Sequence, residues 1–329
     1  MHQIDVIDSK VVSTVVTVPS NDESPSCGVL RAIQRDVLKT LLYFDIFDFP
    51  LRLPEIHQFL PTNSVAITDL RTACLSYPLH DQIKIIDDYV ILKDRPESIV
   101  ANRKRNERRA HILWKVARIM GRIVGSFPFV RAIFVSGELS KGVASAHSDI
   151  DLLIVSENHR VWIVRTLCAV FKRIFLFNQK KLFCYNHIVS QNQLEITERN
   201  LYTAIETVTL KPLLNVAMFE RFRKVNPWTN DFLPNSSCQS TVVAERAREI
   251  PILEQIVVNA IPKSTLDTFD EWLMRKWKLA WEERYPSLTP LKRSELFQCT
   301  SDMSTSYVKD YSTKIMEQYR LRLNRYGIS

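Results

Sequence analysis

The sequence has no long uncharged apolar segment. Its best candidate for a membrane span, 161–177, carries three basic residues, whereas a spanning helix needs about 20 predominantly apolar residues. The N-terminus also lacks a basic flank followed by an apolar core, because Asp5 and Asp8 interrupt it early. We therefore expect neither a membrane span nor a secretory signal.

Paired cysteines, internal repeats and low-complexity tracts are also absent. The six cysteines are scattered and none belongs to a CxxC pair. This spacing argues against a disulfide framework and against a cysteine-based zinc site. It favours a reducing compartment, so the predicted location is cytoplasmic.

Length and composition are those of an ordinary globular protein. The chain has 329 residues, of which 46% are hydrophobic and 24% charged, which is enough for two or three domains with a sizeable core. The net charge of +8 is compatible with a polyanionic partner or substrate but does not require one.

One segment combines a glycine-containing turn with two closely spaced carboxylates. The chain reads as an apolar strand, a turn at 136–142, a short connection and a second strand at 149–155. Side chains alternate faces along a strand, so Asp149 and Asp151 would point the same way, roughly 6–7 Å apart. The opposite face would be filled, and the register fixed, by Ile150, Leu152 and Ile154.

This aspartate pair predicts a metal site. Two like charges at such a separation repel each other unless a cation lies between them. Hard divalent cations prefer carboxylate oxygens and are often shared with substrate phosphates. We therefore expect Mg²⁺, or Mn²⁺ in its place, to be bound by Asp149 and Asp151.

The stretch from about residue 128 to 190 resembles the polymerase β-like nucleotidyltransferase superfamily. That family carries an apolar residue, Gly, and Gly or Ser, then about ten residues later Asp-apolar-Asp/Glu-apolar. The matching residues here are Ser136-Gly137-Glu138 and Ser148-Asp149-Ile150-Asp151-Leu152. The resemblance covers a minority of the chain. It implies an α+β fold with a small, mixed, mostly antiparallel sheet flanked by helices.

The resemblance also implies a reaction, the transfer of a nucleoside monophosphate from a nucleoside triphosphate to an acceptor. The metal on Asp149 and Asp151 would neutralise charge as an acceptor oxygen attacks the α-phosphorus and pyrophosphate leaves. Gly137 would let the backbone approach a phosphate. Ser148 would orient Asp149 through a hydrogen bond. Further candidate phosphate contacts are Ser136, Ser140 and Lys141.

Two features depart from the family pattern. Glu138 stands where Gly or Ser is usual, and it would repel a triphosphate unless it points away or joins the metal shell. The strand predicted at 182–189 has no acid, so Asn186 or Cys184 would occupy the third position. Of these, Asn186 is the candidate metal ligand. Two downstream acids, Glu195 and Glu206, could replace the missing third acid only if the fold brings them back to the site.

The N-terminal region divides into a leader and a small domain. Residues 1–28 are predicted to be a flexible leader with an edge strand at 11–18. Residues 29–95 show three helical segments followed by a strand, a turn and a strand, the order of a winged-helix domain. The predicted third helix, 64–75, carries one Arg and one Asp. That composition suits packing or protein contact better than nucleic-acid contact.

Residues 96–195 are predicted to comprise a long helix followed by the nucleotidyltransferase core. That helix, at 96–125, is strongly basic in its first half. Such a run usually forms a solvated face. The alternative is that Arg108 and Arg109 lie over the site and contact phosphates.

Residues 196–329 are predicted to form a helical C-terminal domain. A long helix at 196–225 would be interrupted near Pro212, and further helices are expected at 242–258, 264–285 and 303–325. Tryptophans in the second of these are expected to pack against preceding helices, with a membrane-surface helix as the alternative: Trp272, Trp277 and Trp281.

The predicted acceptor is a small molecule or a protein. The sequence shows no extended groove of basic and aromatic residues of the kind that tracks single-stranded nucleic acid. Two other functions stay open. Glu138 and the missing third acid are compatible with a weak or inactive binding protein that kept the nucleotidyltransferase fold. The winged-helix-like region is compatible with a nucleic-acid-binding regulator.

Overall fold

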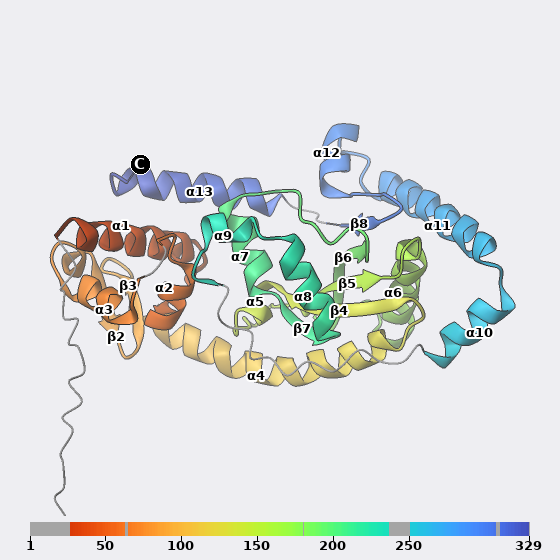
Figure 1. Ribbon diagram of the computed structural model, residues 1–329, viewed down its shortest axis with the longest axis horizontal. Helices are drawn as coiled ribbons and strands as arrows, with labels where there is room; N and C mark the ends of the chain where they lie inside the picture. Colours follow the sequence, from red (N-terminus) through yellow and green to blue (C-terminus); the bar gives the residue numbers. More distant parts are fainter. Residues whose placement is uncertain (1–26, 63–64, 180, 237–250, 307–309, 329) are drawn as a thin grey trace, which may run out of the picture.

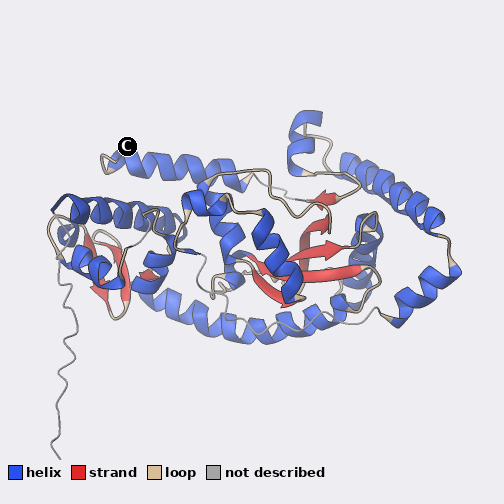
Figure 2. Ribbon diagram, viewed as in Figure 1, coloured by secondary structure: helices blue, strands red, loops and turns tan. Residues whose placement is uncertain are grey.

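The structure is a computed structural model in which two sheets are surrounded by helices (Figures 1 and 2). Within the described residues the fold is mixed α and β, with a three-stranded sheet near the N-terminus and a five-stranded sheet in the centre. The predicted leader, its strand, and the first part of the helix expected at 242–258 lie outside the described residues, apart from Cys27 and Gly28. The described residues are 27–62, 65–179, 181–236, 251–306 and 310–328.

The N-terminal unit has the predicted order of three helices and a hairpin. Apolar residues at helical spacing bury one face of α1 against α2 and α3, and Asp87-Asp88 form the turn between β2 and β3. β1 adds a short third strand, paired with β3. The element bounds are α1 Cys27–Phe44, β1 Leu51–Arg52, α2 Leu53–Phe59, α3 Ile67–Leu75, β2 Ile83–Ile86 and β3 Tyr89–Leu92.

A network of ion pairs ties this unit to the long helix α4, Ser98–Gly125. Arg103 is buried, and its guanidinium donates to Glu55 at 2.6 Å and to Glu107 at 2.9 Å. Glu107 also accepts from Arg52 at 2.8 Å and from Tyr89 at 3.0 Å. Because Arg103 is buried in these pairs, the basic run on α4 is a solvated face only beyond that residue.

The central sheet is mixed and mostly antiparallel, as expected. Its order is β7-β4-β5-β6-β8, and β5–β6 is the parallel pair among four. The flanking helices α5 and α6 follow β4 and β5 in the chain. The bounds are β4 Val130–Ser136, α5 Gly137–Ser140, β5 Asp151–Ser156, α6 Val161–Phe175, β6 Cys184–Ser190, β7 Lys211–Leu214 and β8 Met303–Thr305.

Two of these strands correct the prediction of a purely helical region beyond residue 195. The predicted helix at 196–225 is α7, Leu201–Thr209, then β7, then α8, Val216–Val225. Pro212 lies in β7, an edge strand paired only with β4, where a missing N–H is tolerated. The helix expected from 303 begins instead at Tyr311, because Met303–Thr305 pair with β6 as β8.

The two faces of the central sheet are covered differently (Figure 1). One face, which includes Ile150, Leu152 and Ile154 as predicted, packs against α4, α6 and α11. The other face, which includes Phe134 and Leu153, packs against α8. Helix α9 follows α8, and the remaining helices come from the C-terminal part of the chain. Their bounds are α9 Thr229–Phe232, α10 Ile252–Ala260, α11 Lys263–Arg284, α12 Pro290–Leu296 and α13 Tyr311–Arg325.

Helix α11 packs against the first turn of α6 and accepts hydrogen bonds from it. The Asp270 carboxylate, which is buried, accepts from Trp162 N at 3.0 Å and from Ile163 N at 2.8 Å. These are free donors of the first turn of α6. Trp281 is buried against Trp162, with ring centroids 5.9 Å apart. Packing is thus confirmed for Trp281 and also for Trp277, whereas Trp272 is half exposed.

Helix α7 belongs to two structures at once. Ala204 and Ile205 are buried in the hydrophobic core of the N-terminal unit, which also takes Tyr319 from α13. Tyr319 packs edge-on against Tyr43 of α1 at 5.5 Å. The other side of α7 faces the central sheet across a cavity. The N-terminal unit and the wall of this cavity are therefore built on one helix.

Candidate functional site

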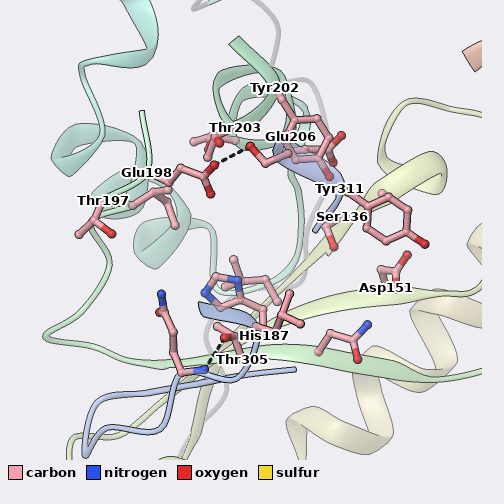
Figure 3. A pocket seen from close by; sticks show the side chains of 18 of the residues that line it. Ser136, Asp151, His187, Thr197, Glu198, Tyr202, Thr203, Glu206, Thr305 and Tyr311 are labelled. Atoms are coloured by element: carbon pink, nitrogen blue, oxygen red, sulfur yellow. Dashed lines mark hydrogen bonds between the residues drawn. The ribbon is translucent and has the colours of Figure 1, made fainter. Parts of the chain in front are cut away.

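A cavity of about 540 Å³ opens on the α8 side of the central sheet (Figure 3). Strands β4, β5, β6 and β8 form its floor, and α7, α12 and the start of α13 form its walls. Four of the predicted metal and phosphate contacts line it, namely Ser136, Gly137, Asp151 and Asn186. The fold therefore brings the two ends of the predicted motif together in one concave site.

Gly137 and Asp151 lie in direct contact. Ser136 is the register partner of Asp151 across β4 and β5, so the turn after β4 begins beside the carboxylate. Gly137 has φ +69°, and a Cβ added to it would lie 2.7 Å from Asp151 Oδ2. Only glycine accommodates both this backbone conformation and the carboxylate.

Asp149 is not on the strand with Asp151, which corrects the predicted alternation. β5 begins at Asp151, and Asp149 belongs to the preceding loop. The backbone of Ile150 is held from the other side, where its N–H donates to Lys181 O at 3.1 Å and its carbonyl accepts from Cys184 N at 2.9 Å. The two aspartates still interact, because the charge of Asp149 raises the pKa of Asp151.

Burial is the main reason that the pKa of Asp151 is raised to about 6. The charges of Asp149 and Glu206 raise this pKa further, while a hydrogen bond from Cys184 and the charge of Lys141 lower it. A carboxylate so placed gains from a cation, because a positive charge beside it stabilises the ionised form.

Strand β6 gives no acid at the third position. Cys184 is the register partner of Asp151 and its thiol bonds to the carboxylate. Burial raises the pKa of this thiol to about 12, so it acts as a donor. The register then shifts by one residue before Leu153 pairs with His187. Asn186 lies at this irregularity and lines the cavity, and its Oδ1 is 3.3 Å from Ser306 Oγ.

The fold brings Glu206 back to the aspartates. It projects from α7 into the cavity (Figure 3). Its carboxylate accepts from Lys141 Nζ at 2.7 Å, and Lys141 also donates to Gly137 O at 3.2 Å. Glu195, the other downstream acid, is exposed and pairs with Arg199 at 2.8 Å. Of the two downstream acids named from the sequence, Glu206 is thus the one that joins the site.

Two of the predicted site residues, Ser140 and Ser148, have partners other than those expected. Ser140 is buried, and its hydroxyl donates to Gly137 O at 2.8 Å, so it fixes the turn and does not line the cavity. Ser148 donates to Glu138 and approaches Ser145 Oγ at 3.0 Å, in place of the expected bond to Asp149. Glu138 also accepts from Ser145 N at 3.1 Å. Glu138 therefore braces the 145–148 loop and is not a cavity residue.

Arg108 and Arg109 are exposed on α4 and outside the cavity. Apart from Glu206, the residues of its far wall were not predicted, because α7, α12 and α13 supply them and no local motif marks them. His187 is on the floor, and burial lowers its pKa to about 4, so its ring is neutral. The wall residues with chemistry are Glu198, Tyr202, Lys292, Glu295, Asp310 and Tyr311.

The side-chain oxygens at the site would suit a metal ion that takes its other ligands from water and substrate. Among the described residues there is no cluster of three or more His, Cys, Asp or Glu side chains able to hold a metal ion. Mg²⁺ is commonly bound through one or two carboxylates and takes its remaining ligands from waters and phosphates. Asp151, with Asp149 nearby and the Asn186 amide on the same floor, fits that pattern and not an all-protein cage.

The chain matches no family model, no curated protein and no solved structure. None of the helices in the described residues is both long enough and apolar enough to cross a membrane.

Proposed function

We propose that this protein is a Mg²⁺- or Mn²⁺-dependent nucleotidyltransferase with a polymerase β-like core. It moves a nucleoside monophosphate from a nucleoside triphosphate to a small-molecule or protein acceptor. The observation that carries the proposal is the Asp151 carboxylate lying against Gly137 on the floor of a cavity. That arrangement places a glycine turn, which leaves room for a phosphate, beside the carboxylate that a metal would need.

Each residue has a role in this proposal. Asp149 and Asp151 would hold the metal with Asn186, and the metal would offset negative charge on the phosphates. Gly137 and Ser136 would contact phosphate oxygens. Glu206 would supply the third carboxylate that β6 lacks, and Lys141, bonded to Glu206, would neutralise part of the negative charge.

A label-transfer assay tests the proposal. All four nucleoside triphosphates, labelled at the α-phosphate, would be incubated with Mg²⁺ or Mn²⁺ and a cell extract. We expect label on an acceptor and release of pyrophosphate, both lost in the Asp149→Asn/Asp151→Asn double variant. Glu195→Gln is the matched control, since that acid lies outside the cavity. Full activity in the double variant would refute the proposal.

A binding protein without catalysis is the second candidate. It is favoured by the missing third acid on β6 and by the lack of a three-residue ligand cluster in the described part of the chain. Calorimetry with each triphosphate and Mg²⁺ separates the two functions. Binding without any turnover would support this candidate, and slow turnover with any of them would exclude it.

The N-terminal unit would be a winged-helix-like packing module. Its core is shared with α7 and α13, and α3 carries only Asp69 and Arg71 as charged residues. A nucleic-acid-binding regulator is the alternative, and steeply salt-dependent binding to duplex DNA would reveal it. We expect no such binding through α3.

A further inference from the structure

The C-terminal end of α6 exposes a group of large apolar side chains to solvent. We call this group the α6 tip. Exposed apolar clusters on a protein surface mark interaction sites more often than single exposed residues do. The α6 tip consists of Val170, Ile174, Phe175 and Phe177, which are 48%, 58%, 66% and 82% exposed.

The backbone after α6 holds the tip in an unusual conformation. Phe177 and Asn178 both have left-handed backbone angles, with φ +46° and +58°. This is uncommon for a bulky residue such as Phe177. Two hydrogen bonds fix the turn, from Asn178 N to Lys172 O at 3.0 Å and from Gln179 N to Leu176 O at 2.7 Å. A turn whose conformation costs free energy thus presents the most exposed phenylalanine.

The segments that form the tip and most of α4 carry positive charge and lack negative charge. No Asp or Glu occurs between residues 158 and 194, or between 108 and 137. The second stretch includes most of α4, whose end lies beside the last turns of α6, with the rings of Phe127 and Phe171 5.5 Å apart. Among the described residues, the exposed cations of these segments are Arg108, Arg109, Lys115, Arg118, Arg122, Arg173 and Lys181.

The outer face of α4 carries the same combination of cations and apolar groups. Ile112 and Ile119 are 65% and 51% exposed. They are seven residues apart, so they lie on one face of the helix, and Arg108 and Lys115 form a neighbouring row at the same spacing. This face is on the opposite side of the sheet from the cavity, so it plays no part in the proposed transfer.

We propose that the α6 tip and the outer face of α4 bind the surface of an anionic lipid bilayer. Phenyl and aliphatic side chains would enter the boundary between headgroups and acyl chains, while the surrounding cations would contact anionic headgroups. Single-stranded nucleic acid would use the two phenylalanines as stacking platforms, but it would gain little from the four exposed Ile and Val side chains. Hydrocarbon accommodates all six, so the bilayer is favoured.

Vesicle co-sedimentation of the full chain tests this inference. The vesicles would contain phosphatidylcholine alone or with one-third phosphatidylglycerol. We expect binding only to the anionic vesicles, weakening as salt rises. Phe175→Ser/Phe177→Ser should lower the partition coefficient at least about tenfold, because the apolar contact is lost. Leu291→Ser, which removes another exposed apolar residue (73%), should have no effect.

Charge reversal gives an independent measurement. Lys115→Glu/Arg118→Glu should weaken binding by about fivefold or more for each residue, the effect of about 1 kcal/mol per cation near an anionic surface. Lys314→Glu on α13 is the matched control. The inference is wrong if anionic vesicles are not bound at low salt, or if both double variants bind like the unaltered chain. Tip-dependent capture of a single-stranded oligonucleotide with no vesicle binding would also overturn it.

Discussion

Asp151 is partly buried and Asp270 is fully buried, and the pKa of each carboxyl group is raised, yet their surroundings differ. The pKa of Asp151 is about 6 and that of Asp270 about 7, in each case mainly because of burial. Asp270 accepts two backbone N–H groups from the start of α6. Asp151 faces a cavity, with Asp149 and Glu206 adding negative charge nearby.

The difference teaches how to separate a structural carboxylate from a functional one. The bonds to Asp270 come from donors that would otherwise be unpaired at a helix end, so this carboxylate has its partners within the fold, even though burial raises its pKa further than that of Asp151. The electrostatic cost at Asp151 is offset only in part by Cys184 and Lys141. The negative charge that these two groups leave uncompensated can be stabilised by a bound cation.

The largest expected effect comes from disturbing Asp151 through its neighbour. In Gly137→Ala the new Cβ would lie 2.7 Å from Asp151 Oδ2, so the carboxylate must move. We expect transfer activity to fall by about 10²-fold or more. Gly142→Ala is the control, since Gly142 has φ +77° but open space around it. Equal loss of activity in both variants would show that backbone strain alone is responsible.

The second prediction concerns Asp270. Asp270→Ala leaves two buried N–H groups of α6 without an acceptor, and we expect a loss of about 2–4 kcal/mol in the free energy of unfolding. Urea denaturation followed by circular dichroism measures it. Glu271→Ala, which removes an exposed acid from the same helix, should change stability by less than about 0.5 kcal/mol. A comparable loss in both would contradict the proposed role of Asp270.

The third prediction is a gain in the free energy of unfolding, where Asp270→Ala gives a loss. Because the pKa of Asp151 is raised in the folded chain, the folded state binds its proton more tightly than the unfolded state does. Stability from this group is therefore present below its ordinary pKa of 3.8 and is lost as the pH rises to about 6. Asp151→Asn should stabilise the chain at pH 7.5, by on the order of 2 kcal/mol, and at pH 4 the gain should vanish. Destabilisation at pH 7.5 would contradict this argument.

The smallest effects concern the neighbours of Asp151. Metal binding requires its ionised form, so Mn²⁺ affinity should rise with pH through about 6. Glu206→Gln removes a charge that raises this pKa, so the midpoint should move down, by less than one pH unit. Lys141→Gln should move it up. Titration of Mn²⁺ binding by electron paramagnetic resonance at several pH values would detect these shifts, and movement in the reverse directions would disprove the assignment.

The sequence predicted the elements whose patterns are local. The helices and hairpin of the N-terminal unit, the strands on both sides of the Gly137 turn and the apolar face of β5 follow from periodicity alone. β7 and β8 were missed because both are short edge strands whose pairing is decided by distant residues. Pro212 reads as a helix interruption until its partner β4 is known.

The site was predictable only along one segment of the chain. Ser136, Gly137 and Asp151 were found because the turn and the strand adjoin in sequence. Glu206 could be named as a possible substitute but not placed, since its position depends on how α7 packs. The bonds of Ser140 and Ser148 depend on loop geometry, which alternation along a strand does not describe.

The dual membership of α7 limits how the protein can be divided. The same helix gives Ala204 and Ile205 to the N-terminal core and Glu206 to the cavity. Expression of the sheet region without residues 27–97 would leave that apolar side of α7 uncovered and its orientation undefined. The N-terminal unit is therefore part of the minimal chain that fixes the position of Glu206, and a shortened version would lose that position even with every strand of the central sheet intact.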